Sequence, residues 1–498
     1  MPIGLTLYGE TPDALFEDVY FQRDFVALHA RPDAIDALEL PGFRHAAAVC
    51  AIPGADAEDM ETPWGYGGPV ARDAPVFWEG LALWRQRQVN HRRIAEFVRV
   101  HPFINPLALR GFLDQIRLDR LTVLVDLSEP SATRRKRYTK GTRYSLNQAE
   151  RRLSLRPLSP TDAALFQRLY EEGLARNGAE RSYFFAPSYY ADLLSSPYAR
   201  AWAAEQDGQA LAVACFLQGG AFAHYHLSGG GEAARTTFAH YLLLECAIEH
   251  YRTRNCRWMH LGGGRSTAPN DALFRFKTRF GMKRVPFYTG GLIHDRAAFE
   301  RMTQGRRDRF LSYRFPTIPD LSRAPVALHP ANEDDFVAFF RIKCDVDNIV
   351  WSGHERPPDW SGLEQWFKRH LSGGTGRRML MAHALDRTVG YAYVDDHGDR
   401  LEATVGVAAG ESGHGLGRSI LRETARLADA GTRPLEAWIF PENRASVRAF
   451  EAAGFALDET RPPRPFAMPL PDLAPREQRC WVYQGATEAA APSRMAAP

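Results

Sequence analysis

A glycine-rich segment in the last third of the chain contains the residues whose types and spacing most clearly predict chemistry. Residues 405–421 read as a strand, a loop with glycines at 410, 413, 415 and 417, and the start of an amphipathic helix. Glycine lets backbone amides approach a ligand closely, and the first helical turn has unpaired N–H groups with partial positive charge. The segment therefore predicts a pyrophosphate cradle. Its spacing matches neither the Gly-x-x-x-x-Gly-Lys-Ser/Thr loop nor the Gly-x-Gly-x-x-Gly loop.

The elements after this loop strengthen the prediction. Residues 435–443 read as a strand that ends in a polar loop, and residues 443–455 read as a helix. Asn443 is suited to the N-cap of this helix, and Gly454 is suited to its C-terminal stop. The expected order is strand, glycine loop, helix, strand and Asn-capped helix.

This order resembles the GNAT acyl-CoA N-acyltransferases over about residues 325–486. In that family the loop signature is Arg/Gln-x-x-Gly-x-Gly/Ala; here Ser412 takes the leading position, whereas both glycines are kept. The resemblance implies acetyl-CoA or another acyl-CoA as co-substrate. It also implies that loop amides hold the CoA pyrophosphate and that an asparagine contacts the pantetheine arm. The implied cofactor-binding residues are Gly413, His414, Gly415, Leu416, Gly417, Arg418 and Asn443.

The family often has a tyrosine general acid seven residues after that asparagine, where this chain has Phe450. Either another group protonates the thiolate, or the step needs no donor. Glu402, on the strand before the cradle, is a candidate to relay a proton from the amine; a solvent-facing strand glutamate is the alternative.

An acceptor pocket is expected from the helices that precede these strands, as GNAT domains commonly form it there. The candidate substrate-binding residues are Trp351, His354 and Trp366. Aromatic faces suit a sugar or nucleotide acceptor. Packing of both tryptophans in the core explains the pattern equally well.

A second resemblance covers about the first 300 residues, which look like the FemABX group of aminoacyl and peptidyl transferases built from two GNAT-like halves. The segments that carry it are Asp18-Val-Tyr-Phe21, Trp64-Gly-Tyr-Gly-Gly-Pro69, Arg99-Val-His-Pro-Phe103, Val123-Leu-Val-Asp-Leu127, His224-Tyr-His-Leu-Ser228, His260-Leu-Gly-Gly-Gly264 and Leu273-Phe-Arg-Phe-Lys-Thr-Arg-Phe280. Members act on cell-wall precursors with aminoacyl-tRNA, whereas looser relatives are acetyltransferase-like. The segment 260–264 looks closer to the looser set, so no cofactor is assumed for this half.

Two groups in this half have candidate roles. The resemblance places Lys277 at the family's Phe-Lys position, where a lysine can pair with substrate phosphate or the oxyanion. Eight basic residues between 134 and 152 stand against one acid, Glu150, and are candidates to contact tRNA, a lipid-linked diphosphate or an anionic membrane surface; a solvated basic helix is the alternative. His224 and His226 share one strand face without a third ligand at a metal-like spacing, so no metal is expected.

Composition sets the broad class. The chain has 498 residues and a formal net charge of +3, so its bulk charge does not argue for a nucleic-acid partner. The six cysteines include no Cys-x-x-Cys pair, which favours a reduced, cytoplasmic protein without a disulfide framework or a zinc site. Neither a signal peptide nor a transmembrane segment is apparent in the sequence.

The expected fold class is α+β (mixed α/β): three GNAT-like domains, each a mixed, mostly antiparallel sheet with flanking helices. The expected boundaries are 1–150 and 151–310 for the two FemABX-like halves, 311–325 for a linker, 326–486 for the GNAT domain and 487–498 for a disordered tail.

The expected function is acyl-CoA-dependent N-acyl transfer to an amine, such as an amino sugar or a cell-envelope precursor. Two alternatives stay open: aminoacyl-tRNA-dependent transfer by the N-terminal half, and a non-catalytic scaffold of GNAT folds. A tRNA partner is not favoured, and peripheral membrane contact stays open.

Overall fold

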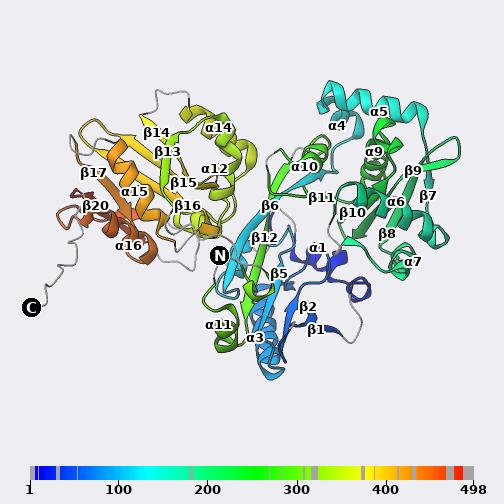
Figure 1. Cartoon of the computed structure of the whole chain (residues 1–498), viewed down its shortest axis with the longest axis horizontal. Coiled ribbons are helices and arrows are strands. Elements are labelled where there is room, and N and C mark those ends of the chain that lie inside the picture. The colour runs from blue at the N-terminus through cyan, green and yellow to red at the C-terminus, as the bar shows by residue number, and fades with distance from the viewer. Residues whose placement is uncertain are drawn as a thin grey trace, which may run out of the picture. The chain divides into compact units, whose positions relative to one another are not determined.

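The computed structural model describes residues 6–8, 11–29, 34–52, 54–179, 183–268, 270–281, 283–306, 309–315, 324–371, 376–385, 387–411, 414–428, 433–466 and 476–485. The chain forms two compact units, which divide between residues 315 and 316. Each unit is considered by itself (Figure 1).

The first unit, residues 4–315, is built on one 12-stranded sheet across its described residues. Its strands are β1 (Ile35–Leu40), β2 (Phe43–Ala51), β3 (Glu58–Glu61), β4 (Val70–Ala71), β5 (Ala95–Arg99), β6 (Gln115–Asp126), β7 (Ser154–Pro157), β8 (Ala199–Gln206), β9 (Gln209–Gly219), β10 (Phe222–Gly230), β11 (Trp258–Gly263) and β12 (Lys283–Ile293). Its helices are α1 (Pro12–Phe16), α2 (Arg23–Val26), α3 (Ala74–Asn90), α4 (Ser131–Arg137), α5 (Lys140–Arg152), α6 (Ala163–Arg176), α7 (Pro187–Ser195), α8 (Ala233–Thr236), α9 (Ala239–Arg252), α10 (Ala272–Lys277) and α11 (Arg296–Thr303). The 3₁₀ turns are η1 (Val19–Phe21), η3 (Pro106–Leu109), η4 (Pro160–Asp162) and η6 (Ser312–Arg314).

The strand order is β1-β2-β3-β5-β12-β6-β11-β10-β9-β8-β7, with β4 paired to β2. Two neighbouring pairs, β3 with β5 and β10 with β11, are parallel, and the other described pairs are antiparallel. The expected mixed, mostly antiparallel sheet is therefore confirmed. Strand β12 lies between β5 and β6. It belongs to the expected second half, 151–310, yet it pairs with strands of the expected first half, 1–150.

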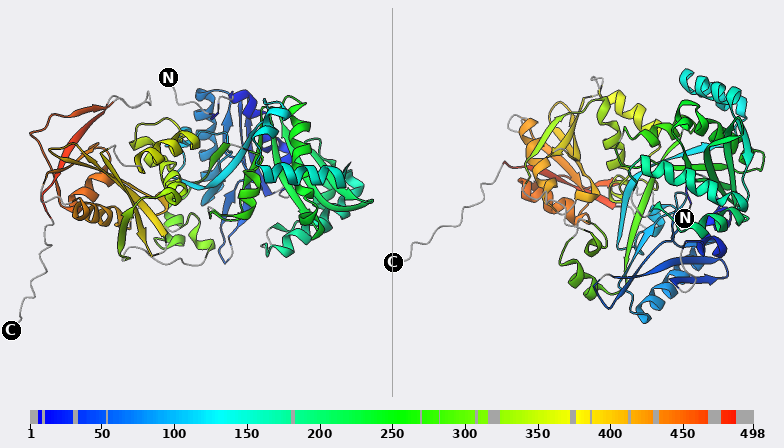
Figure 2. Two further views of the ribbon diagram at one scale, coloured as in Figure 1. Left: turned by 90° about the horizontal axis from the view of Figure 1, so that it is seen from above. Right: turned by 45° about the vertical axis from the view of Figure 1, so that its right-hand side comes forward.

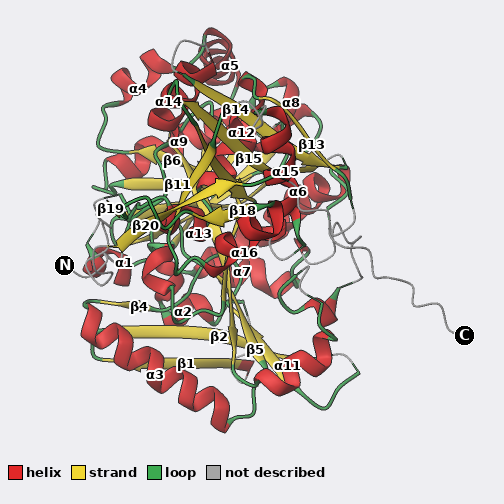
Figure 3. Cartoon of the chain, turned by 90° about the vertical axis from the view of Figure 1, so that its left-hand side faces the viewer, coloured by secondary structure: helices red, strands yellow, loops and turns green. Residues whose placement is uncertain are grey.

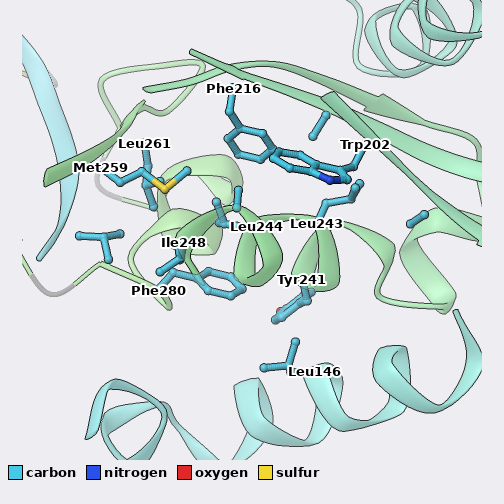
Figure 4. Packing of buried hydrophobic residues seen from close by; sticks show 14 of the residues in the cluster. Leu146, Trp202, Phe216, Tyr241, Leu243, Leu244, Ile248, Met259, Leu261 and Phe280 are labelled. Carbon is cyan, nitrogen blue, oxygen red and sulfur yellow. The ribbon is translucent and has the colours of Figure 1, made fainter. Parts of the chain in front are cut away.

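Helices cover both faces of the β8–β11 part of the sheet. Alternate residues of β8 and β9 face opposite sides, as a strand requires: Trp202 and Phe216 join one cluster with α5 and α9, whereas Ala203 and Val213 join another with α6 and α7. Figure 4 shows the first cluster, in which Leu244 and Ile248 of α9 pack under Phe216 and Met259. Fully burying a large apolar side chain of this kind stabilises the fold by about 1.5–3 kcal/mol.

At the other end of the sheet, α3 packs along β1 and β2 (Figure 3). Gly80 makes this approach possible, since a Cβ there would lie 2.3 Å from the ring of Phe43 on β2. Asp73 begins the helix by accepting a hydrogen bond from the backbone N–H of Val76 (2.9 Å).

The second unit is built on an 8-stranded sheet across its described residues, in the order β13-β14-β15-β16-β17-β20-β18, with β19 paired to β20. Its strands are β13 (Val326–Pro330), β14 (Arg377–Ala384), β15 (Arg387–Asp396), β16 (Leu401–Val407), β17 (Leu435–Ile439), β18 (Phe455–Leu457), β19 (Arg464–Phe466) and β20 (Arg476–Tyr483). Its helices are α12 (Phe336–Lys343), α13 (Val346–Trp351), α14 (Trp360–Leu371), α15 (Leu416–Leu427) and α16 (Arg444–Ala453), with 3₁₀ turns η7 (Glu333–Asp335) and η8 (Ala409–Glu411).

Strand β15 shows how this sheet is covered on both faces. Tyr391 and Tyr393 contact the ring of Phe339 on α12, whereas Ala392 and Val394 face the clusters that contain α15 and α16 residues. Figure 2 shows the two helical layers from two further sides. Strands β16 and β17 are parallel, and the other described pairs are antiparallel.

The first residues of the expected linker, 311–325, include residues that pack on the first unit. Ser312 is fully buried, and the hydroxyl of Tyr313 donates a 2.9 Å hydrogen bond to Asp59, which also pairs with Arg314. These contacts hold residues 312–314 on the first unit. Residues 316–323 of the expected linker and the expected tail, 487–498, lie outside the described residues.

Candidate functional site

In the second unit, the parallel strands β16 and β17 are paired at only two positions. Leu401 pairs with Leu435 and Glu402 with Glu436, whereas β20 pairs with the other edge of β17. The strands thus separate toward the end of β16, and the chain then enters the glycine loop. A separation of this kind places the loop, the helix after it and the helix after β17 around one region.

The glycine loop leads into α15 as predicted. Gly415 is the N-cap at φ +75°, and among the described residues a Cβ placed on it would find a single neighbour within 4 Å, the Arg418 guanidinium at 4.0 Å. A Cβ on Gly410 would meet none of the described atoms within 4 Å. The loop backbone is thus open to a ligand, beside the unpaired N–H groups of a 12-residue helix.

Further contacts fix the start of this loop. The backbone N–H of Ala409 donates to buried Asp345 at 2.8 Å, and Glu411 forms an ion pair with Arg387. Gly417 lies in the first turn of α15, where a Cβ would be in ordinary contact with Val407 and Ala449. Leu416 is buried and anchors the first turn.

His414 and Arg418 flank the Gly415 cap on the loop side and the helix side. Their roles in cofactor binding, like those of the loop glycines, stay predictions. Gly413 and Ser412 lie outside the described residues.

Asn443 is the N-cap of α16, as the sequence predicts. Its Oδ1 accepts a hydrogen bond from the N–H of Ser446 at 3.2 Å. The cap uses the oxygen, so a contact with a bound ligand would come from the Nδ2 amide group. Its contact with pantetheine stays a prediction.

Phe450 lies in the hydrophobic core. It is buried, and its ring contacts Phe455 with centroids 5.0 Å apart. A packing residue thus stands where the family often has a tyrosine, and Phe450 itself has no proton to donate.

A polar group that the sequence did not single out lies at Gly406, on the face of the sheet away from α15 and α16. A Cβ on Gly406 would lie 2.4–2.8 Å from the ring and hydroxyl of Tyr391, so the missing side chain makes room for this tyrosine. Nζ of Lys343 lies 3.4 Å from the Tyr391 hydroxyl and 3.1 Å from Oγ of Ser352. Asn348 donates to the carbonyl of Val407 at 3.2 Å and joins α13 to the end of β16.

Of the three predicted acceptor residues, Trp351 ends α13, His354 follows it, and Trp366 lies on α14. Trp351 contacts Phe440, with centroids 5.8 Å apart, and Trp366 stacks on Phe339 at 6.0 Å with an interplanar angle of 7°. Burial, then the nearby Lys343, lowers the pKa of His354. The binding of substrate by these three residues stays a prediction. Trp366 packs on the face of the sheet that α12 covers.

Glu402 is held at the start of β16. Both of its oxygens accept hydrogen bonds from Arg464, at 3.2 and 3.1 Å, and His397 lies 3.6 Å away. At about 3.3 Å per residue, five residues of strand separate Glu402 from Val407 by about 17 Å. Its action as a base stays a prediction.

In the first unit, the parallel strands β10 and β11 separate in a similar way. Their pairing ends at His224 and His260. The two glycines that end β10, however, serve packing: a Cβ on Gly229 would lie 2.3 Å from the backbone of Tyr170, and one on Gly230 would lie 2.9 Å from Ala234. The end of β10 therefore lacks the open backbone found at Gly415.

Lys277 is buried beside the last residues of β11. Its Nζ donates to the carbonyl of Gly263 at 2.7 Å and would lie 3.3 Å from a Cβ on Gly262. Burial lowers the pKa of Lys277 to about 7. A lysine with this pKa is suited to proton transfer near neutrality, although its role stays a prediction.

The basic segment 134–152 is more neutralised than the sequence indicates. Arg134 and Arg135 both pair with buried Glu245, at 3.0 and 2.8 Å, and Arg135 also pairs with Glu150. Arg137 pairs with Glu129. Because Glu245 comes from α9, the local count of charges overestimated the positive charge of this surface.

Sequence comparisons find two matches to domain models. Residues 326–456 and residues 132–277 each match the model of an acetyltransferase (GNAT) domain. No curated protein matches the chain significantly. Among the described residues, the helices lack the combination of length and apolar character that a membrane crossing requires.

Three solved structures are given as examples of those that match part of this chain. FemX is 10% identical at a TM-score of 0.47, covering 59% of this chain and 99% of its own. The C-terminal DUF2156 domain of an Agrobacterium fabrum protein is 16% identical at a TM-score of 0.39, covering 58% of this chain and 92% of its own. A Vibrio cholerae spermidine N-acetyltransferase with bound CoA and spermine is 12% identical at a TM-score of 0.29, covering 32% of this chain and 94% of its own.

Proposed function

Because the chain contains two GNAT acetyltransferase domains and is thus an acyltransferase, we propose that its second unit transfers an acyl group from acyl-CoA to an amine. Acetyl is the simplest acyl group, and an amino sugar or a cell-envelope precursor is the proposed acceptor. The observation that carries this proposal is the open backbone at Gly415. It lies at the N-terminus of α15, where a phosphate would meet unpaired N–H groups.

The contrast between the two GNAT domains supports this assignment. Beside Gly415 and Gly410 there is room for a ligand, whereas Gly229 and Gly230, which end β10 in the first unit, are packed against protein atoms. A pyrophosphate needs access to backbone N–H groups. The proposal therefore places the acyl-CoA in the second unit only.

The proposed reaction requires positioning and proton transfer without a protein nucleophile. The amine nitrogen attacks the thioester carbonyl, the C–N bond forms, the C–S bond breaks, and CoA leaves as a thiolate that takes up a proton. The enzyme aligns the reactants and stabilises the oxyanion. The amine gives up one proton to solvent in the same step, and the group that protonates the thiolate regains its proton from solvent, so the products are the amide and the CoA thiol.

We assign the proton donor for the thiolate to Tyr391. Its hydroxyl lies over Gly406, near the end of β16, and Lys343 lies within 3.4 Å of it. A hydrogen bond from Nζ of Lys343 would hold this hydroxyl in place. This tyrosine would supply the proton that Phe450, buried in the core, cannot.

Calorimetry with CoA and acetyl-CoA tests the cofactor, and release of CoA in the presence of a panel of amines tests the transfer. We expect binding of both compounds and amine-dependent release of CoA. Absence of CoA binding by the full chain would overturn the proposal.

A tRNA-dependent activity of the first unit is the second candidate, and the buried Lys277 is the observation that favours it. The pairing of Arg134, Arg135 and Arg137 with acidic residues argues for weak tRNA binding. A gel-shift titration at two salt concentrations separates the candidates, because phosphate contacts weaken steeply with salt. Tight, tRNA-specific retention at physiological salt would place this activity first.

A further inference from the structure

Two groups of described residues each bring three typical metal ligands together. One consists of Asp18, His101 and His224 in the first unit, and the other of His329, Asp335 and His383 in the second. In each group, one ligand atom per residue lies within 4.8 Å of the other two. The positions of the ring protons distinguish the two groups.

In the first group, hydrogen bonds account for the arrangement. The N–H of Phe103 donates to Nδ1 of His101 at 3.4 Å, so a neutral His101 ring has its proton on Nε2, which faces Asp18 at 3.4 Å. The carboxylate of Asp18 also accepts from Nε2 of His224 at 2.7 Å and from the N–H of Tyr20 at 3.0 Å. His101 therefore has no lone pair left for a metal, and the group is a hydrogen-bonded part of the core.

The second group has the opposite proton arrangement. Nδ1 of His329 lies 2.9 Å from the carbonyl of Pro330, which only accepts, so Nδ1 carries the proton and Nε2 has a free lone pair. Metal-ligating histidines typically donate their other ring N–H to a carbonyl or carboxylate in this way. The bond to Pro330 thus orients His329 as a ligand.

The other two members of this group, His383 and Asp335, also have atoms that are available to bind a metal ion. Nε2 of His383 is buried and has no hydrogen-bond partner among the described residues, and its ring lies 4.6 Å from that of His329. Asp335 accepts one 2.9 Å bond from the N–H of Asn332, which leaves acceptor capacity on its two oxygens.

We propose that His329, His383 and Asp335 form a binding site for a divalent transition metal of the Zn²⁺ type. Two imidazoles and one carboxylate are ligands that Zn²⁺ accepts, and three protein ligands leave a position for water. Co²⁺, Ni²⁺ and Cu²⁺ bind the same donors, so the site is defined by ligand class.

The position of the three ligands indicates what the metal does. His329 is on β13, which lies at the edge of the sheet, His383 is on the neighbouring β14, and Asp335 ends η7 immediately before α12. A bound ion would therefore fasten the edge strand to its neighbour and to the start of α12. Because binding to the folded state alone stabilises it, the ion should raise the unfolding temperature of the unit.

The test uses the full chain without a histidine tag, freed of metal by a chelator. Calorimetric titration with ZnCl₂ should show one ion per chain, and Co²⁺ should give visible absorption bands of a protein-bound ion. Zn²⁺ should also raise the unfolding temperature. His383→Ala and Asp335→Asn should lose all three effects.

His397→Ala provides the matched control, since His397 is partly exposed in the turn between β15 and β16 of the same domain. It should bind Zn²⁺ as the parent does. Circular dichroism checks that each variant is folded, and Asp335→Asn, which conserves shape, serves if His383→Ala unfolds. Absence of Zn²⁺ binding by the parent, or unchanged binding by a folded Asp335→Asn or His383→Ala variant, would overturn the proposal.

Discussion

The cofactor proposal is tested most directly by replacing Gly415 with leucine. A Cβ at this position has free space, so the new side chain would occupy the volume above the α15 N-terminus where the proposed phosphate lies. Charge-assisted hydrogen bonds are worth about 1.5–3 kcal/mol each, and losing one weakens binding by about 10- to 140-fold. We expect a loss of CoA affinity of at least this size.

The substitution also strains the backbone, and this effect has to be separated from ligand exclusion. Gly415 is at φ +75°, where a residue with a side chain costs about 1–2 kcal/mol. For a unit of this size each kcal/mol lowers the unfolding temperature by about 2–4 °C, so a decrease of about 2–8 °C is expected.

Gly398→Leu is the matched control. Gly398 is at φ +88° in the turn between β15 and β16, and a Cβ there meets no atom of the described residues within 4 Å. The two variants should lose similar stability, yet only Gly415→Leu should lose CoA binding in calorimetry. Equal CoA affinity of Gly415→Leu and the parent, or equal loss in both variants, would refute the cradle.

Three further predictions concern the proton donor, the buried lysine and the independence of the second unit. Tyr391→Phe should lower kcat by about 10²-fold or more while CoA affinity is kept. The control Tyr393→Phe, two residues along the same strand face, should keep the kcat of the parent. An unchanged kcat in Tyr391→Phe would exclude Tyr391 as the proton donor. Because the pKa of Lys277 falls from 10.5 to about 7 on folding, the unfolded chain binds more protons between these values, and this residue makes stability rise with pH across that window. Denaturant titrations should show that the stability gained by Lys277→Met is largest below pH 7 and shrinks toward pH 10; a gain independent of pH would contradict the lowered pKa. A chain shortened to residues 324–498 should fold by circular dichroism and bind CoA, and an unfolded product would show that the two units depend on each other.

The features read correctly from the sequence are those set within a few residues of one another. The strand, glycine loop and helix around Gly415 follow from local backbone preferences, and the cap at Asn443 follows from a side-chain oxygen three residues before its N–H partner. The alternation of mixed strands and helices likewise follows from hydrophobic periodicity, and domain models match both GNAT domains.

Contacts between distant segments were decided by the tertiary structure. The basic segment was overestimated because Glu245, about 110 residues away from Arg135, neutralises it. Tyr391 was missed because its importance depends on Gly406 of the next strand, which leaves space only once the two strands pair.

The same reason governs the proposed metal site and the boundary of the linker. His329 and His383 meet because β13 and β14 pair, and the sequence separation between them carries no metal-like spacing. Residues 312–314 were assigned to a linker from a nearby run of prolines, yet Asp59, which holds Tyr313 and Arg314, is 254 residues away from Tyr313. Periodicity and capping depend on neighbours along the chain, whereas strand order and charge pairing depend on which distant surfaces the fold brings into contact.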